Sequence, residues 1–355
     1  MRLCFLGDAG SIHLQRWIDY FLAAGHEVEV ISFRDSKDVR VPVHLLAGGR
    51  SGRLAYIWGL LKIRGLVQQI RPDILHAHYA TSFGLLGVAS GFHPYVVSAW
   101  GSDVLVAPNR SRLLRAVVRL VLGRADALTS DSLFMSQRMA ELMPGPANPV
   151  LTVTMGVLRS WLSQIQERPR QAYQILSLRG HQEIYNIDVI LRSAAEVIKA
   201  LPEARFIIAG EGPETSKLKA LAQELGIDRQ TRFVGQVPHP GVQAYLEESV
   251  VSVSVPSSDA TAVSLLETMA CGAFPVVTDL PANREWVKDG VNGLIVPAKD
   301  AEALASALIR ALREESLRHQ ATRINREKVR AKAIWEDNMA EVEGMYLELL
   351  YQTRP

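Results

Sequence analysis

The stretch SSDATAVSLLETMACG, residues 257–272, decides the fold because it joins a buried strand to a helix. Upstream of it, residues 250–255 (VVSVSV) combine β-branched side chains with small serines, a composition typical of a strand inside a parallel sheet. Pro256 and the polar residues after it end this strand, and the Leu, Met, Glu and Ala content of residues 262–270 predicts a helix. A strand, a loop and a helix in this order indicate an α/β protein.

The same stretch contains two acids, Asp259 in the predicted loop and Glu267 in the predicted helix. A helix that begins at the carboxyl end of a strand presents unpaired backbone N–H groups, here near Val263, Ser264 and Leu265, and such groups bind phosphate. Glu267 lies about one turn further along, where it is placed for the ribose of a nucleotide whose phosphates rest on the helix start. The alternative is that Asp259 is a turn residue and Glu267 a solvated helix acid.

With its continuation LLETMACGAFPVVTD, this segment resembles the acid-x7-acid motif of retaining glycosyltransferases of family 4, and the resemblance covers nearly the whole chain. It implies the GT-B fold, an α/β architecture of two doubly wound Rossmann-like domains that face each other across a cleft. It also implies that Asp259 contacts hydroxyls of the donor sugar and that Glu267 binds the nucleotide ribose. The family usually has Glu at the first position, and the shorter Asp sets the carboxylate back by about 1.5 Å.

Length and composition fit this organisation. The 355 residues are too many for one ordinary core, and the hydrophobic share of 48% supports buried sheets. There are two cysteines, Cys4 and Cys271, so we expect no disulfide framework, a reducing compartment and no zinc cluster. The apolar stretch LCFLG after Met1 and Arg2 is too short for a signal peptide or a membrane span, which predicts a cytoplasmic protein.

The first half, residues 1–157, is predicted as the acceptor-binding domain. Strands at 3–7 and 27–33 flank a helix at 14–24, which is a βαβ unit. The loop GDAGSIH between them resembles the family's first glycine turn beside the donor diphosphate, which assigns that contact to Gly10 and Ser11. His13 stands where the loop meets the helix, and we expect it either to bind an anion or acceptor or to face water.

Further acceptor candidates follow two later strands. The carboxyl end of the strand at 73–77 directs His76 and His78 toward the crevice, where ligands bind in such sheets. A structural role is the alternative for both and is favoured for His76. In SAWGSDVL, Trp100 stands where many family members have a His. Trp100 is predicted either to stack on an acceptor or to pack in the core, and Asp103 to accept a hydroxyl proton.

The second half is predicted as the donor-binding domain, residues 170–333, after a linker near 158–170. Arg179 ends a strand at 173–178 and matches the family Arg that binds the donor phosphates. The usual Lys six positions on is Tyr185 here, so the diphosphate charge falls to Arg179 and the helix start, with hydrogen bonds from Tyr185 or His181. Glu211 in GEGPE and the backbone near Val237 are the further donor contacts that the resemblance implies. A final amphipathic helix, 334–351, is expected to cross back to the first domain.

Charge is unevenly distributed along the chain. Residues 1–155 contain 16 Lys and Arg against 11 Asp and Glu, and residues 39–72 and 104–125 contain several of these cations. In the second of these segments Arg112, Arg115 and Arg119 fall on one helical face, as in a helix that lies on an anionic membrane, but a solvated helix has the same pattern. No nucleic-acid-binding motif accompanies the charge.

These features predict a retaining glycosyltransferase that moves a sugar from a nucleoside-diphosphate sugar to a hydroxyl of a glycan, glycolipid or lipid-linked acceptor. Asp259, Arg179 and Glu267 are the expected catalytic residues. No metal and no cofactor besides the nucleotide-sugar co-substrate is expected, and no dedicated base is evident, which suits the family's front-face mechanism. Two alternatives are a nucleotide-sugar epimerase on the same fold and a non-catalytic nucleotide-sugar-binding protein.

Overall fold

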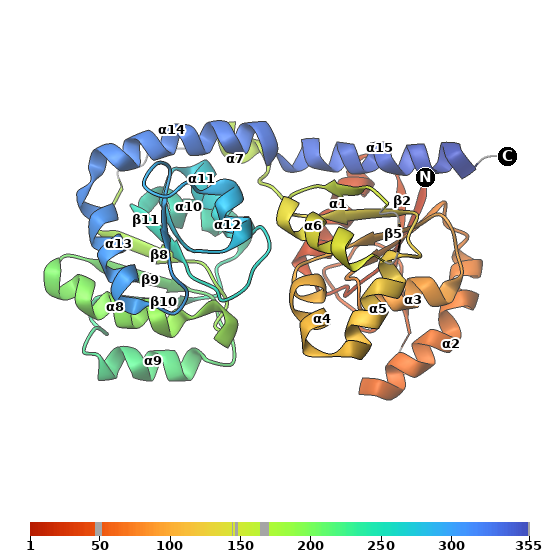
Figure 1. Ribbon diagram of the computed structural model, residues 1–355, viewed down its shortest axis with the longest axis horizontal. Coiled ribbons are helices and arrows are strands. Elements are labelled where there is room, and N and C mark those ends of the chain that lie inside the picture. The colour runs from red at the N-terminus through yellow and green to blue at the C-terminus, as the bar shows by residue number, and fades with distance from the viewer. Residues whose placement is uncertain (47–51, 144, 146–147, 164–169, 354–355) are drawn as a thin grey trace. The chain divides into compact units, whose positions relative to one another are not determined.

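The structure is a computed structural model that describes residues 1–355 except 47–51, 144, 146–147, 164–169 and 354–355. The chain forms two compact units (Figure 1). Unit 1 comprises residues Met1–Thr154 and Glu336–Pro355, and unit 2 comprises Met155–Trp335. The first boundary thus lies three residues before the predicted one, and the last segment joins unit 1 two residues after the predicted position.

Over the described residues, unit 1 contains one parallel sheet of seven strands in the order β3-β2-β1-β4-β5-β6-β7. The order reverses between β1 and β4, so their carboxyl ends form the switch point where doubly wound sheets bind ligands. The strands are β1 (Arg2–Leu6), β2 (Glu27–Ser32), β3 (Val43–Leu45), β4 (Ile74–His78), β5 (Tyr95–Ser98), β6 (Ala127–Ser130) and β7 (Val150–Thr152).

Helices cover both faces of this sheet because parallel strands need crossover connections, which are almost always right-handed. That handedness places α1 on one face and α2, α3 and α5 on the other, and α15 packs on the same face as α1 (Figure 1). The helical segments are α1 (Ile12–Ala23), α2 (Gly52–Ile70), α3 (Ser82–Ser90), the π-helical turn η1 (Ser102–Val106), α4 (Ala107–Arg110), α5 (Arg112–Leu122), α6 (Leu133–Leu142) and α15 (Trp335–Thr353).

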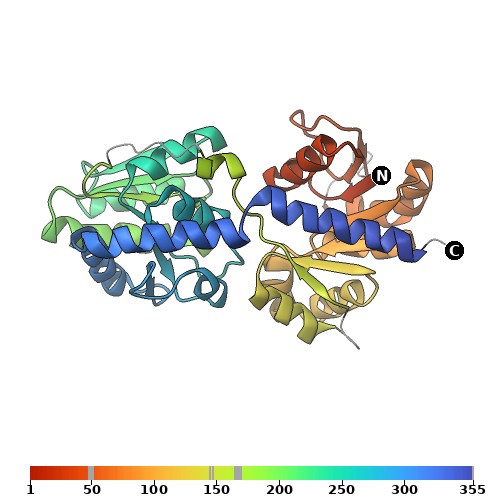
Figure 2. The ribbon, with the colours of Figure 1, turned by 90° about the horizontal axis from the view of Figure 1, so that it is seen from above.

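The last helix, α15, packs into unit 1 through buried aromatic and polar contacts, and Figure 2 shows it lying across this unit. The ring of Tyr346 stacks on Phe21 with 5.3 Å between centroids, and its hydroxyl hydrogen-bonds to Nδ1 of His76. Asn338 donates to the backbone oxygen of Thr154 at 2.9 Å. The sheet core of unit 1 is therefore completed by the carboxyl-terminal segment.

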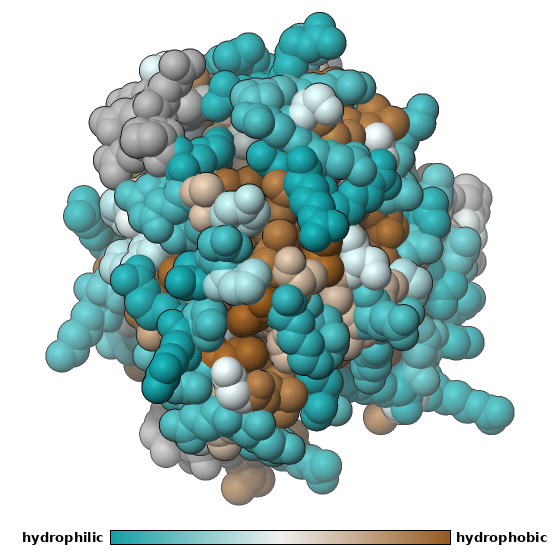
Figure 3. Space-filling model, turned by 90° about the vertical axis from the view of Figure 1, so that its left-hand side faces the viewer, coloured by the Kyte–Doolittle hydropathy of each residue, from teal (hydrophilic) through white to brown (hydrophobic). Residues whose placement is uncertain are grey.

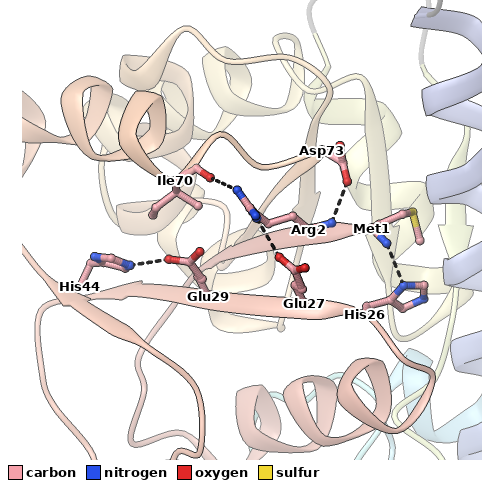
Figure 4. A network of polar contacts seen from close by, with 8 residues as sticks. All are labelled: Met1, Arg2, His26, Glu27, Glu29, His44, Ile70 and Asp73. Atoms are coloured by element: carbon pink, nitrogen blue, oxygen red, sulfur yellow. Dashed lines mark hydrogen bonds and ion pairs between the residues drawn. The ribbon is translucent and has the colours of Figure 1, made fainter.

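At the amino ends of the strands, a polar network ties neighbouring segments of unit 1 together (Figure 4). Arg2 Nε lies 3.0 Å from Glu27 Oε2, and its Nη1 donates to the backbone oxygen of Ile70 at 3.1 Å. The next strand contributes a bond of 2.7 Å between His44 and Glu29. Arg2 and Glu27 lie at the edge opposite the switch point, Glu29 and His44 lie further along their strands, and these contacts link neighbouring strands.

Unit 2 contains, over its described residues, a parallel sheet of six strands in the order β10-β9-β8-β11-β12-β13, with the switch point between β8 and β11. The second strand after the switch point, β12, has residues buried along its whole length. The strands are β8 (Gln174–Ser177), β9 (Arg205–Ala209), β10 (Thr231–Gly235), β11 (Val251–Ser254), β12 (Phe274–Thr278) and β13 (Leu294–Val296).

The helices of unit 2 bury apolar residues against this sheet, and hydrophilic side chains predominate on the outer end of the unit in Figure 3. The apolar face of α8, for example, buries Ile187, Ile190 and Leu191. The helical segments are α7 (Arg159–Ser163), the 3₁₀ turn η2 (Glu183–Tyr185), α8 (Ile187–Ala200), α9 (Thr215–Glu224), α10 (His239–Glu248), α11 (Val263–Cys271), α12 (Pro281–Trp286), α13 (Ala301–Arg313) and α14 (Glu315–Lys332).

The carboxyl end of α11 is capped by groups from distant segments. Gly272 adopts φ +78, in the left-handed region that suits glycine after a helix. Arg170 donates to the Cys271 oxygen at 2.7 Å, and Arg326 Nε donates to the Ala270 oxygen at 3.2 Å. These guanidinium groups satisfy carbonyls that a helix end leaves unpaired and oppose the negative end of its dipole.

Two parts of the chain differ from the sequence predictions. The predicted first domain runs to residue 157, but its last strand, β7, ends at Thr152, and Val157 forms an isolated bridge with Ile334. Residues 39–72, expected only as a basic segment, contain β3 and the 19-residue helix α2. Among the described residues, no helix is long and apolar enough to cross a membrane.

Candidate functional site

The first turn of α11 lies at the switch point of unit 2, after β11. The N–H groups of Leu265 and Leu266 both donate to the Ala262 oxygen, at 3.0 and 3.4 Å. Within the described residues, those of Val263 and Ser264 have no backbone acceptor. The N–H of Leu265 is thus used inside the chain, contrary to the prediction, and two N–H groups remain for an anion.

Arg179 follows β8 and is only 8% exposed, yet it has three partners around its guanidinium. Its Nη2 lies 2.7 Å from Asp259 Oδ2, and its Nη1 donates to Ser264 Oγ over a longer 3.4 Å. The guanidinium carbon lies 4.3 Å from the ring centroid of Tyr185, a cation–π contact. Arg179, Asp259 and Ser264 therefore form one cluster, and Tyr185 contributes to it by holding Arg179.

Asp259 belongs to the loop between β11 and α11, and its Oδ1 accepts the N–H of Ala260 at 3.0 Å. Burial raises the pKa of Asp259 above its ordinary value, while the positive charge of Arg179 acts in the opposite direction. The ion pair thus offsets the cost of burying this carboxylate. A sugar hydroxyl that hydrogen-bonds Asp259 would meet an acid already oriented by its neighbours.

Glu267, on the second turn of α11, is 6% exposed. Its Oε1 lies 3.1 Å from Nε2 of His239, the first residue of α10. The His239 ring in turn packs against Trp161, with 5.0 Å between centroids and 33° between planes. His239 was not predicted: a His at the start of a helix after a strand was its only signal, and its partner is 28 residues away.

A small cavity lies between the strand ends and α11. Hydroxyl groups contribute to its lining, and Thr268 donates to Ser252 at 2.9 Å. Ser264, which also accepts from Arg179, connects this lining to the cluster. The lining residues are Leu178, Ser252, Val253, Ser254, Ser264, Leu265, Thr268, Pro275 and Val277.

The loops after β8 and β9 approach each other so closely that only glycine fits between them. A Cβ on Gly210, which has φ +103, would lie 2.4 Å from the Arg179 oxygen. A Cβ on Gly212 would lie 2.4 Å from the oxygen of His181. This contact fixes the backbone position of Arg179.

The other predicted donor contacts lie at the same edge of the unit 2 sheet. His181 is buried, its Nδ1 is 2.8 Å from Thr215 Oγ1, and its N–H donates to the Glu211 oxygen at 3.0 Å. It therefore holds the loop and is not placed for phosphate, contrary to the prediction. The side chain of Glu211 is exposed, and Val237 is half-buried in the loop after β10.

In unit 1, the loop after β1 satisfies its own backbone groups. The N–H of Gly10 donates to Asp8 Oδ1 at 3.1 Å, and that of Ser11 donates to the Asp8 oxygen at 2.9 Å. Both N–H groups predicted to approach the diphosphate are thus engaged in this structure. Of the two glycines in this loop, Gly7 is the more crowded, because a Cβ there would lie 2.7 Å from the Leu14 side chain.

The two histidines at the end of β4 are buried. His76 bonds to Ser98 Oγ at 2.7 Å and to Tyr346, so its predicted structural role is confirmed. His78 is 1% exposed, and its ring nitrogens have no hydrogen-bond partner among the described residues. Burial lowers the pKa of His78 to about 3. Its ring lies in an aromatic nest with Trp17 and Phe5, at 4.8 and 5.1 Å between ring centroids. His78 therefore lies below the surface and cannot contact an acceptor, contrary to the prediction.

Trp100 covers this nest, with its ring 5.4 Å from His78 and 5.7 Å from His13. Trp100 is half-exposed and His13 is exposed, so both remain candidates for the acceptor side. Asp103 is different because it is fully buried and its two oxygens accept the N–H groups of Ala80 and Trp100, at 2.6 and 3.1 Å. It holds the loop instead of receiving a hydroxyl proton, which corrects the prediction. Burial raises its pKa to about 6.

No group of three or more His, Cys, Asp or Glu side chains that could hold a metal ion occurs among the described residues. Within the cluster of Arg179, Asp259 and Ser264, Arg179 carries the positive charge.

Comparison with known proteins agrees with this architecture. Residues 2–132 match the family described as Glycosyl transferase 4-like, and residues 162–328 match Glycosyl transferases group 1. A phosphatidyl-myo-inositol mannosyltransferase from Mycobacterium leprae is 26% identical, with 90% of this chain and 87% of that protein covered. A D-inositol 3-phosphate glycosyltransferase from Thermomonospora curvata is 25% identical, with 88% and 85% covered.

Solved structures share the fold. Sucrose-phosphate synthase from Thermosynechococcus elongatus aligns with a TM-score of 0.85 at 17% identity over 99% of this chain and 100% of that one. Anabaena HepE in complex with UDP-glucose aligns with a TM-score of 0.80 at 15% identity over 98% and 100%. The chain therefore belongs to the family 4 type of glycosyltransferases, with a glycosyl transferase 4-like domain followed by a group 1 domain in the GT-B fold.

Proposed function

We propose that this glycosyltransferase moves a sugar, with retention of anomeric configuration, from a nucleoside-diphosphate sugar to an acceptor hydroxyl. The observation that carries this proposal is the convergence of Arg179, Asp259 and the first turn of α11 at the switch point of unit 2. An oriented cation and unpaired N–H groups suit a diphosphate, and an acid beside them suits sugar hydroxyls. The relatives named above as glycosyltransferases are consistent with this reaction.

In the proposed reaction, the bond between the anomeric carbon and the phosphate oxygen breaks and a bond to the acceptor oxygen forms on the same face of the sugar. The acceptor proton passes to the departing phosphate oxygen. Arg179 and the N–H groups of Val263 and Ser264 stabilise the charge that develops on the diphosphate. Asp259 orients the sugar, and Glu267 binds the ribose.

We further propose that the reaction needs no metal ion, because Arg179 and α11 supply the positive field at the leaving group. Turnover should then be unchanged after treatment with EDTA. A loss of activity that Mg²⁺ or Mn²⁺ restores would contradict this part of the proposal.

A thermal-shift screen of UDP-, GDP- and ADP-sugars and the corresponding diphosphates tests the donor site. A ligand at a hundredfold excess over Kd stabilises the folded state by about 2.7 kcal/mol, so a true donor should stand out. Incubation with the stabilising donor and candidate acceptor alcohols then separates the activities: a glycosyltransferase releases diphosphate and glycosylates the acceptor, an epimerase changes the sugar without transfer, and a binding protein does neither. NMR of the product gives the anomeric configuration.

We propose that the acceptor is a membrane lipid or lipid-linked glycan that unit 1 meets at an anionic bilayer. In α5 the predicted arginines Arg112, Arg115 and Arg119 are exposed, and none forms an ion pair within the described residues. Leu113, beside them, is 73% exposed. A helix that exposes cations next to apolar side chains fits a bilayer interface.

The distribution of apolar surface supports this orientation. Every exposed large hydrophobic residue in the described part of the chain belongs to unit 1, and three of them, Leu54, Ile57 and Leu61, form one stripe along α2. Both α2 and α5 lie on the face of the sheet opposite α15 (Figure 1). Residues 336–353 of α15 contain five acids and neither Lys nor Arg.

Liposome flotation tests the membrane proposal. Each cation near an anionic surface contributes about 1 kcal/mol, so replacing Arg112, Arg115 and Arg119 by Ser should reduce partitioning roughly a hundredfold. High salt should release the wild-type protein because it screens these charges. A triple variant that floats like wild type, or a wild-type protein that never floats, would contradict the proposal and favour a water-soluble acceptor.

A further inference from the structure

Asn186 is a buried polar residue that none of the assigned roles includes. It lies between η2 and α8, is 4% exposed, and has φ +50, a left-handed conformation that Asn tolerates better than most residues. Its side chain does not cap α8. The amide instead points to the loop that follows β11.

Four contacts join Asn186 and Ile184 to that loop, the longest being Ser257 Oγ donating to Asn186 Oδ1 at 3.3 Å. The Asn186 amide donates to the Val255 oxygen at 2.8 Å and to Ser257 Oγ at 2.9 Å. The Ser257 N–H donates to the Ile184 oxygen at 2.8 Å. The loop is thus held on each side of Pro256 by one short segment that is about 70 residues away in sequence.

The clamped segments are the ones that supply the partners of Arg179. Tyr185, directly before Asn186, stacks on the guanidinium, and Asp259, two residues after Ser257, forms the ion pair with it. The remainder of the site has other supports, because Glu267 and Ser264 belong to α11 itself. Release of the clamp would therefore free Asp259 while leaving the helix in place.

We propose that Asn186 is a positioning residue that fixes the Asp259 loop, and with it the sugar-binding side of the donor site. This inference rests on the proposed function for its catalytic consequence but not for its structural content. The residue acts through the Val255 carbonyl and the Ser257 hydroxyl, not by contact with substrate. Orientation of such groups matters because small displacements of a site residue reduce rates strongly.

Asn186→Gly is the variant of choice, since Gly adopts the left-handed conformation freely and only the side-chain bonds are lost. Asn186→Asp keeps the shape and removes the two hydrogen bonds that the amide donates, while its carboxylate can still accept from the Ser257 hydroxyl. Asn325→Ala serves as a matched control, because Asn325 is fully buried in unit 2 and exchanges hydrogen bonds of 2.7 and 3.0 Å with Asn292, outside the site.

Hydrogen exchange of the ligand-free proteins is the first measurement. We expect amides of residues 257–260 to exchange about tenfold faster or more in Asn186→Gly, and by a smaller factor in Asn186→Asp, with α11 unchanged. Equal protection of the loop in wild type and Asn186→Gly would overturn the inference. So would the same local acceleration in Asn325→Ala, because the loop would then respond to any loss of stability.

The second measurement separates an effect on the donor sugar from an effect on nucleotide binding. With UDP-glucose and GDP-mannose as donors, Asn186→Gly should release sugar at least tenfold more slowly, while its Kd for UDP or GDP stays within about threefold of wild type. If Asn186→Gly loosens the loop but leaves turnover unchanged, the proposed effect of Asn186 on catalysis is wrong. A wild-type protein that binds no nucleotide sugar would instead refute the proposed function, and the exchange result would still decide the role of Asn186.

Discussion

Glu267 is the residue whose assigned role is most directly measurable. Glu267→Gln keeps the size of the side chain but removes the charge that strengthens its hydrogen bonds to ribose hydroxyls. We expect affinity for the nucleoside diphosphate to fall by about 1.5–3 kcal/mol, as measured by calorimetry. Equal affinity in both proteins would remove Glu267 from the nucleotide site.

His239 provides the comparison for Glu267. His239→Phe retains an aromatic ring against Trp161 and loses only the 3.1 Å contact with Glu267. If His239 merely orients the acid, the loss of nucleotide affinity should be smaller, about 0.5–1.5 kcal/mol. A larger effect than in Glu267→Gln would show that His239 itself contacts the ligand.

Arg179 should act on phosphates alone. Arg179→Lys retains a positive charge near Asp259 but loses the planar, forked geometry that fits phosphate oxygens and stacks on Tyr185. We expect weaker binding of the nucleoside diphosphate, by about 1.5–3 kcal/mol, and unchanged binding of the nucleoside. If calorimetry shows that the nucleoside is lost as well, the substitution has damaged the fold and the assignment fails.

At the scale of elements, the carboxyl-terminal cap of α11 should affect stability but not chemistry. Arg326→Met removes one charge-assisted hydrogen bond to Ala270, which should lower the free energy of unfolding by about 1–2 kcal/mol in urea. Turnover with saturating donor should stay within about twofold of wild type. Arg323, exposed on the same helix α14, gives the control, and equal stability of Arg323→Met and Arg326→Met would contradict the capping role.

The strands of unit 2 were predictable because buried parallel strands are written as short apolar runs. The strands predicted at 173–178 and 250–255 are β8 and β11, each one residue shorter at either end. Edge elements lack that signal: β3 has three residues, none of them buried, and α2 mixes exposed leucines with arginines. Such a helix departs from the pattern of one apolar face against the core.

The positions of Arg179, Asp259 and Glu267 near one edge of the unit 2 sheet were predictable for a similar reason. Each of these residues belongs to a local motif that follows a strand, and the carboxyl ends of parallel strands meet at the same edge of a sheet. Asn186 and His239 act through partners 69 and 28 residues away, so no local pattern reveals them. The errors in unit 1 have one cause: His78 ends β4 and Asp103 lies in the η1 turn after β5, but both are below the surface, and depth is not encoded in strand position.

For the molecule as a whole, the buried histidine predicts how stability changes with pH. The pKa of His78 is about 3 in the folded state, below the ordinary value of 6.5, so stability declines as pH falls through 6.5 toward 3. Between pH 7 and pH 5 this residue should account for about 2 kcal/mol. His78→Phe fits the aromatic nest. Between pH 7 and pH 5, the free energy of unfolding in urea should fall by about 2 kcal/mol less in this variant than in wild type. Parallel losses in both proteins would exclude His78 as the cause.

The return of α15 to unit 1 also sets an order for biosynthesis. A ribosome that has finished β7 must still translate all of unit 2 before it reaches Tyr346, which at about 5–20 residues per second takes roughly 10–40 s. During that interval unit 1 lacks Tyr346, whose hydroxyl bonds to His76 and whose ring stacks on Phe21. Unit 2 is one continuous segment, so it can complete its fold before α15, the last helix of unit 1, has been synthesised.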